Sequence, residues 1–301
     1  MIYLAHFGLR EPPFSITPDT SFFCSCRSIQ EALNTLCFAA TNGEGFIKIT
    51  GEVGTGKTLL CRKFLGALGP EWVPAYVPNP NLAPQTLLRA VADELGCVLY
   101  KDMDEHALMR AVNHRLLDLA RENKRPILCI DESQAMSIET LEMVRLLTNL
   151  ETEKRKLLQV VLFGQPELDE KLSRNEIRQL RQRITFEHRL SPLTREETAH
   201  YLTHRLIVAG YSGAGLFTRA ATRVIHRASG GVPRLANIIA HKTLMLAFGR
   251  GVRSIGWREA VAAADDTPAT IPMRRKPWAW VGVACAACAV ALVGLVMKGY
   301  L

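Results

Sequence analysis

Short apolar runs alternate with segments of helical periodicity over much of the chain. The runs have the length and composition of buried strands and lie at 46–50, 73–77, 127–130 and 157–163. The segment 184–190 alternates more and predicts the last strand. Apolar residues spaced three to four apart predict helices around them, at 30–41, 59–65, 84–95, 104–122 and 139–150. Strands that alternate with helices predict an α/β fold, in which helices cover a parallel sheet.

Beyond residue 193 the periodicity is helical only. It predicts helices at 196–209, 218–228, 233–248 and 256–264. Thr194 and Glu197 have the spacing of a capping box before the first of these helices. We therefore expect a core domain over residues 46–192 and a small all-α lid over 193–265. The prolines and the absence of periodicity in 266–277 predict a linker.

Residues 1–45 precede the first strand. Their opening part is rich in proline and phenylalanine, which favour turns and extended chain over helix. We expect this part to wrap the core domain and to lead into the helix at 30–41.

The segment 278–297 is almost wholly apolar. No charged residue lies between Lys276 and Lys298, so a helix here is long enough to cross a hydrocarbon layer of about 30 Å. Trp278 and Trp280 suit one membrane interface. The basic residues 274–276 precede them and predict that the large domain lies in the cytoplasm, with the C-terminus on the far side.

Composition sets broad limits. Apolar residues make up 48% of the chain and charged residues 22%, as in an ordinary globular protein. The net charge of +8 suits nucleic acid, anionic lipid or simply a basic surface. The eight cysteines do not form a disulfide framework, which argues for reduced thiols. Cys285 and Cys288 have C-x-x-C spacing, but they lie in an apolar run with no second pair of zinc ligands.

Residues 51–58 read GEVGTGKT and satisfy every fixed position of the phosphate-loop motif. The motif needs a strand before it and a helix after it, and both are predicted here. Backbone N–H groups of such a loop converge on phosphate, and the helix N-terminus adds about half a positive charge. Lys57 is expected to reach the β- and γ-phosphates, and the Thr58 hydroxyl to ligate Mg²⁺. The expected nucleotide-binding residues are Gly51, Glu52, Val53, Gly54, Thr55, Gly56, Lys57, Thr58 and Leu59.

Two carboxylates follow the apolar run 127–130. Open α/β sheets place their ligands at the C-terminal ends of parallel strands, where Asp131 and Glu132 are expected to lie. Asp131 is the second expected Mg²⁺ ligand, directly or through water. Glu132 is expected to orient and deprotonate the attacking water. The sequence therefore predicts hydrolysis of the bound nucleotide in addition to its binding.

Over residues 1–265 the chain resembles AAA+ ATPases of the ExeA-like, or general secretion pathway protein A, branch. The resemblance rests on the octet above, on Phe7-Gly8-Leu9, Pro13-Phe14 and Pro18-Asp19, and on Gly164-Gln165-Pro166-Glu167-Leu168. Within that branch it is strongest to the ATPases of mannose-sensitive haemagglutinin (MSHA) pilus biogenesis, a type IV pilus system. The resemblance implies an AAA+ core, a helical lid and a membrane helix in the bacterial inner membrane, with the C-terminus periplasmic.

The resemblance also implies roles for three polar residues. Gln165 matches the sensor 1 position, where an amide contacts the attacking water or the γ-phosphate; the alternative is a turn glutamine. Arg183 matches the arginine finger, which acts on a neighbouring subunit and therefore implies a homo-oligomer; Arg181 is the alternative. Arg234, at the start of a lid helix, matches sensor 2.

Three functions fit this reading of the sequence. The first is a membrane-anchored cytoplasmic ATPase that drives or regulates assembly of a type IV pilus or a type II secretion-like machine, with the assembly proteins as partners. The second is a nucleic-acid-dependent AAA+ ATPase of the transposition-helper type, favoured by the basic residues between Lys171 and Arg189. The third is a nucleotide-gated binding module without appreciable turnover.

Overall fold

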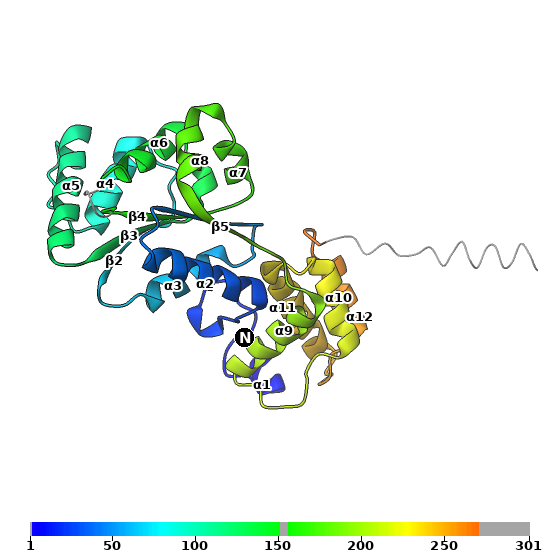
Figure 1. Ribbon diagram of the computed structural model, residues 1–301. Helices are drawn as coiled ribbons and strands as arrows, with labels where there is room; N and C mark the ends of the chain where they lie inside the picture. Colours follow the sequence, from blue (N-terminus) through cyan, green and yellow to red (C-terminus); the bar gives the residue numbers. More distant parts are fainter. Residues whose placement is uncertain (1, 151–155, 271–301) are drawn as a thin grey trace, which may run out of the picture.

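A parallel sheet forms the centre of the core domain (Figure 1). The computed structural model describes residues 2–150 and 156–270. Its strands are β1 (Phe46–Gly51), β2 (Trp72–Val77), β3 (Arg125–Ile130), β4 (Gln159–Gly164) and β5 (Ile184–Leu190). Their order is β2-β3-β4-β1-β5, and each neighbouring pair is parallel. The predicted strands and the parallel α/β sheet are confirmed. Since β3, β4 and β1 are neighbours, their C-terminal ends meet at one edge.

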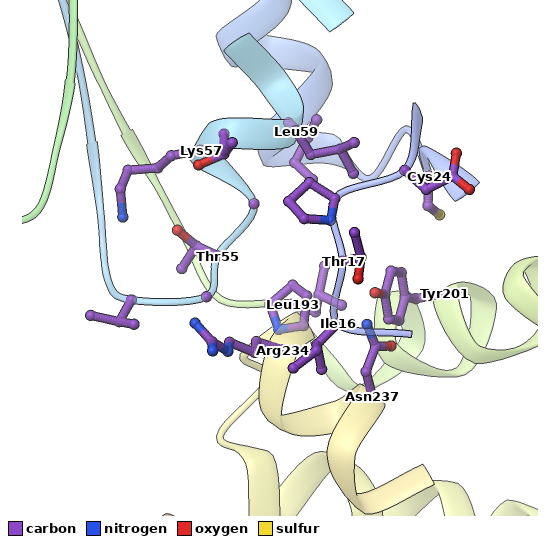
Figure 2. Close-up of a pocket in the computed structure, with 18 of the residues that line it drawn as sticks. Ile16, Thr17, Cys24, Thr55, Lys57, Leu59, Leu193, Tyr201, Arg234 and Asn237 are labelled. Atoms are coloured by element: carbon purple, nitrogen blue, oxygen red, sulfur yellow. The ribbon is translucent and has the colours of Figure 1, made fainter. Parts of the chain in front are cut away.

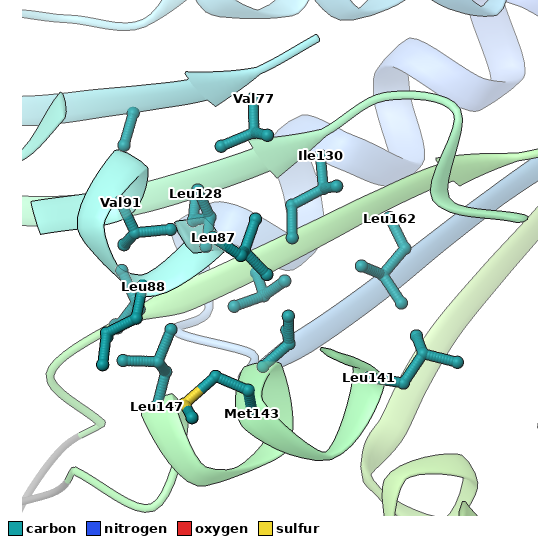
Figure 3. Packing of buried hydrophobic residues seen from close by; sticks show 14 of the residues in the cluster. Val77, Leu87, Leu88, Val91, Leu128, Ile130, Leu141, Met143, Leu147 and Leu162 are labelled. Atoms are coloured by element: carbon teal, nitrogen blue, oxygen red, sulfur yellow. The ribbon is translucent and has the colours of Figure 1, made fainter. Parts of the chain in front are cut away.

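Helices cover both faces of the sheet, as alternating side chains require. One face packs on α2 (Arg27–Thr41) and α3 (Lys57–Ala67), where Leu36 and Phe64 meet Ile49 and Phe163. The other face packs on α4 (Pro84–Glu94), α5 (Glu105–Arg121) and α6 (Ile138–Leu147). Figure 3 shows side chains of α4 and α6 against those of β3 and β4. Successive residues of a strand point to opposite faces, which explains why the inner strands β3 and β4 are apolar over most of their length, whereas the edge strand β5 alternates.

Two short helices lie between β4 and β5. They are α7 (Glu167–Leu172) and α8 (Arg178–Arg183), joined by the 3-10 helix η3 (Asn175–Ile177). The sequence pattern did not predict them, because segments of six residues are too short to display helical periodicity. Their apolar residues Leu168, Leu172 and Leu180 are buried in the same cluster as α4 and α6.

The lid consists of α9 (Arg195–Val208), α10 (Arg219–Ser229), α11 (Pro233–Gly249) and α12 (Trp257–Asp265). It agrees with the four predicted helices to within two residues at each end. The capping box at α9 is present: the Glu197 N–H donates to Thr194 Oγ1 at 3.2 Å, and the Thr194 N–H donates to Glu197 Oε2 at 2.8 Å.

The opening segment packs mainly on the lid, whereas we predicted that it wraps the core domain. It contains α1 (Leu4–Phe7) and the 3-10 helix η1 (Thr20–Phe22). Residues 3–26 contribute their buried side chains to the lid's hydrophobic cluster. Tyr3 and His241 are hydrogen-bonded at 2.9 Å, and the Arg10 N–H donates to the carbonyl of Ala209 at 2.8 Å. The lid helices bury apolar side chains of their own, such as Ile239 and Leu244, and the aromatic side chains of the opening segment enlarge this small cluster.

Within residues 2–150 and 156–270, no helix has the length and apolarity that crossing a membrane requires. The predicted membrane helix at 278–297 lies outside the described residues, as does most of the predicted linker.

Candidate nucleotide-binding site

The phosphate loop joins β1 to α3 at the edge where the strands end. Gly54 and Gly56 have φ of 82° and 102°, in the left-handed region that glycine enters without a steric penalty. The helix α3 begins at Lys57, so its N-terminal N–H groups face the loop. The backbone therefore has the shape and the electrostatic character of an anion-binding loop.

Lys57 lies inside its own loop. Its side chain is buried, and Nζ donates to the carbonyls of Gly51 at 2.7 Å and Glu52 at 3.0 Å. Burial lowers the pKa of the Lys57 ammonium, and the carboxylates of Glu132 and Asp131 oppose that shift only in part. The loop carbonyls are neutral acceptors, so a bound phosphate would be a stronger, anionic partner for this ammonium.

The two expected Mg²⁺ ligands are in direct contact. Thr58 Oγ1 donates to Asp131 Oδ2 at 2.6 Å, and the N–H of Glu132 donates to Asp131 Oδ1 at 2.9 Å. Burial raises the pKa of the Asp131 carboxyl, although both of these hydrogen bonds act in the opposite direction. A hydroxyl and a carboxylate beside a phosphate loop are hard oxygen donors, so the residues present fit Mg²⁺.

Glu132 and Gln165 are hydrogen-bonded across the ends of β3 and β4. Gln165 Nε2 donates to Glu132 Oε2 at 3.1 Å. A second amide, Gln134 Nε2, donates to the same oxygen at 2.5 Å. Sequence reasoning missed Gln134, because its only signal was its place two residues after the carboxylate. Glu132 itself has a positive φ of 50°, which is unusual for a residue with a Cβ.

The lid closes one side of the cleft (Figure 2). Arg234 lies in the first turn of α11, and its backbone N–H donates to the carbonyl of Gly54 at 3.2 Å. Its side chain lines the cleft together with the phosphate loop, Glu132 and Gln165. The structure thus brings Arg234 to the same cleft as the core residues predicted to act with it.

The N-terminal segment and α9 form the rest of the cleft wall, which sequence reasoning did not assign. Residues Ser15–Asp19 pass beside the loop, and Tyr201, Arg205 and Asn237 face them from the lid. Arg205 holds this segment in place, since its guanidinium donates to the carbonyls of Pro13 at 2.5 Å and Ser15 at 3.2 Å. The Pro18-Asp19 motif lies in this wall.

Comparison with known proteins places this cleft in a family. Residues 40–172 match the family model of the AAA domain. General secretion pathway protein A of Aeromonas hydrophila is 43% identical over 254 residues, which cover 84% of this chain and 46% of that protein. The chain belongs to the general secretion pathway protein A family of AAA+ proteins. It spans about half the length of this relative.

Solved structures share the fold of this family member at low identity. ORC2 of Aeropyrum pernix is 17% identical, with a TM-score of 0.64, and the match covers 84% of this chain and 72% of that one. Cdc6p of Pyrobaculum aerophilum is 18% identical, with a TM-score of 0.63 and the same coverage. At such identity the likeness concerns the fold alone.

The two candidate finger arginines of this AAA+ chain lie away from its own cleft. Arg183, the last residue of α8, donates from Nη1 to Thr148 Oγ1 at 3.2 Å and is half-buried. Arg181 is exposed and lines a separate hollow with Lys48, Glu187 and Arg189. Neither lines the cleft formed by the phosphate loop and the lid.

Proposed function

We propose that this AAA+ chain hydrolyses ATP in the cleft between its phosphate loop and its lid. The observation that carries the proposal is the position of Glu132, a carboxylate that lines the same cleft as Lys57 and Thr58. A phosphate loop alone binds nucleotide, whereas a carboxylate beside the γ-phosphate position supplies a base for water.

Each polar group has one task in this proposal. The loop N–H groups and Lys57 bind the phosphates and balance their charge, and Glu132 accepts the proton of the attacking water. Thr58 and Asp131 would hold Mg²⁺, which would supply Lewis-acid stabilisation of the phosphate oxygens. Gln165 and Arg234 contact the γ-phosphate region from β4 and from the lid. Closure of the lid excludes water other than the nucleophile.

The test is steady-state turnover together with nucleotide binding. Glu132→Gln should bind ATP with wild-type affinity and lose turnover by at least about 100-fold, because the amide cannot accept the proton. Lys57→Ala should weaken binding itself. Glu139→Gln, an exposed carboxylate at the start of α6, is the matched control and should change neither. Wild-type turnover in Glu132→Gln would remove the proposed base.

We further propose that the ATPase is anchored in the bacterial inner membrane by residues 278–297 and serves assembly of a secretion or type IV, MSHA-like pilus machine. Support comes from the relative named general secretion pathway protein A and from the apolar C-terminal segment. Copurification after detergent extraction, compared between wild type and Glu132→Gln, tests this role. Retention of secretion or pilus assembly proteins in an ATP-dependent manner is expected, and their absence from both preparations would contradict it.

A DNA-dependent ATPase is the second candidate. One structural neighbour is described as Drosophila ORC bound to DNA, and α8 carries exposed arginines, including Arg178 and Arg181. Salt-dependent binding of duplex DNA with stimulation of turnover would favour this function. Replacement of both arginines by glutamine should then reduce the salt dependence.

A further inference from the structure

The carboxylate of Glu132 is held through one of its two oxygens. Oε2 accepts hydrogen bonds from the side-chain amides of Gln134 at 2.5 Å and Gln165 at 3.1 Å. Among the described residues, no hydrogen bond is formed by Oε1, and Glu132 lines the cleft. A carboxylate bound in this manner has one oxygen fixed and the other available to a water molecule.

The side-chain amide of Gln134 has only one orientation that satisfies its neighbours. The backbone N–H of Gln165 donates to Gln134 Oε1 at 3.0 Å. Since that N–H can only donate, the carbonyl end of the amide must face it, and the NH₂ end must face Glu132. Gln134 therefore spans the gap between the end of β4 and the carboxylate that follows β3.

The backbone around Gln134 is fixed as firmly as its side chain. It lies in the 3-10 helix η2 (Ser133–Ala135). Lys171 Nζ, from α7, donates to the carbonyls of Gln134 at 2.5 Å and Met136 at 2.7 Å. In the same turn, the buried Ser133 hydroxyl donates to the carbonyl of Ile130 at 2.9 Å. These contacts stabilise a turn that begins with the unusual φ of Glu132.

We propose that Gln134 is a positioning residue that, with Gln165, fixes Glu132 Oε2 so that Oε1 points at the attacking water. Lys171 supports it by holding the turn from α7. This inference rests on the proposed hydrolysis by Glu132. It assigns Gln165 a second role besides sensing the γ-phosphate, and it links the catalytic carboxylate to α7.

The test compares two replacements of Gln134 that differ in what they keep. Gln134→Met matches the side chain in length and removes both hydrogen bonds. Gln134→Glu keeps an acceptor for the Gln165 N–H and replaces the donor to Glu132 by a like charge. Both should lower kcat by about 10- to 100-fold, the cost of a misplaced reacting group, with the Kd for ATP changed less than threefold. Gln85→Met, on the exposed surface of α4, is the control for the amide-to-thioether change.

A second comparison separates positioning from general destabilisation. In a Glu132→Gln background, the single-turnover rate should not fall further when Gln134→Met is added, because the group that it positions has gone. An equal fold loss in both backgrounds, or a kcat of Gln134→Met within twofold of wild type, would overturn the proposal. If Glu132→Gln alone keeps wild-type turnover, the proposed role of Glu132 as the base fails, and the positioning role fails with it. If Glu132→Gln is inactive while Gln134→Met is active, only the positioning role fails.

Lys171 provides an independent variant. Lys171→Met should lower kcat in the same direction as Gln134→Met with little change in the Kd for ATP. Lys124→Met is its matched control, because Lys124 is also half-buried and its Nζ donates to the carbonyl of Pro70. Lys124 and Pro70 precede the N-terminal ends of β3 and β2, at the edge of the sheet opposite the cleft. Equal kcat in the two lysine variants would contradict the support assigned to Lys171.

Discussion

The backbone N–H of Arg234 donates to the carbonyl of Gly54 at 3.2 Å, so the first turn of a lid helix rests on the phosphate loop. The approach is close: a Cβ on Gly54 would lie 2.6 Å from the Cβ of Arg234. The conformation of the loop and the position of the lid are therefore linked by direct contact. A nucleotide that rearranges the loop must also displace or reseat α11.

Gly54→Ala tests this contact. The residue has φ of 82°, and its methyl group would collide with Arg234, so both strain and displacement of the lid are expected. We expect a loss of at least about 1–2 kcal/mol in the free energy of unfolding, the cost of a left-handed conformation alone. Chemical denaturation measures it. Gly66→Ala is the control, since a Cβ at this α3 position meets nothing within 4 Å and should stabilise by up to about 1 kcal/mol.

Asp131→Asn should separate stability from activity. Burial raises the pKa of folded Asp131 above 3.8, so the folded protein binds this proton more tightly than the unfolded chain does. The free energy of unfolding therefore falls as the pH rises from 3.8 through the raised pKa. At neutral pH the full cost of the buried carboxylate is present. The asparagine is neutral, and the Thr58 hydroxyl can reverse its role and accept a hydrogen bond from the new amide.

We therefore expect ligand-free Asp131→Asn to have a higher Tm than wild type at pH 7 and a much smaller gain near pH 4, while Mg²⁺-dependent turnover is lost. Thermal unfolding at both pH values checks the first part and an ATPase assay the second. Asp118→Asn, on the exposed side of α5, should show no such gain. An equal gain at both pH values would contradict the assigned cause.

Arg205→Lys tests the anchor of the N-terminal segment. The guanidinium is buried, donates in three directions to Pro13, Tyr201 and Ser15, and lies 4.6 Å from the centroid of the Phe22 ring. An ammonium cannot reproduce this planar arrangement. We expect a loss of about 1.5–3 kcal/mol in the free energy of unfolding, the value of one hydrogen bond to a charged group. Arg223→Lys, an exposed position on α10, should remain within about 0.5 kcal/mol of wild type.

Mixing of subunits tests the arginine finger. Arg183→Ala keeps an intact cleft, and Lys57→Ala keeps an intact finger, so each should be inactive alone, while a mixture should regain turnover at shared interfaces. The gain should depend on the mixing ratio in an ATPase assay. Arg181→Ala is the neighbouring comparison and should retain most activity. If Arg181→Ala is inactive alone and regains turnover when mixed with Lys57→Ala, while Arg183→Ala retains activity, the finger is Arg181. If neither arginine variant regains turnover when mixed with Lys57→Ala, action in trans is contradicted.

The features that the sequence predicted best are those set by local chemistry. The octet at 51–58 requires a strand, a tight loop and a helix, and the capping box at Thr194 marks a helix start within one residue. Apolar runs identified the inner strands β3 and β4, because strands buried on both faces have no polar side. The placement of Asp131 beside Thr58 followed from the rule that strand ends in a parallel sheet share an edge.

What the sequence did not reveal depends on contacts between distant segments. Gln134 gains its role only because the end of β4 brings the N–H of Gln165 to its carbonyl oxygen. Lys171 is one of many basic residues in its stretch, and only the fold selects it to bind the turn after β3. The aromatic character of residues 3–26 indicated that their side chains would be buried. No local sequence feature indicated whether they would pack on the core domain or on the lid.

That N-terminal packing has a consequence for the synthesis of the protein. Tyr3 and its partner His241 are 238 residues apart, so Tyr3 leaves the ribosome long before His241 is synthesised. Until then the aromatic side chains of residues 3–26 have none of their lid partners. Residues 3–26 thus emerge well before the lid helices on which they pack, and a nascent chain halted inside the lid carries an exposed apolar segment that chaperones can recognise.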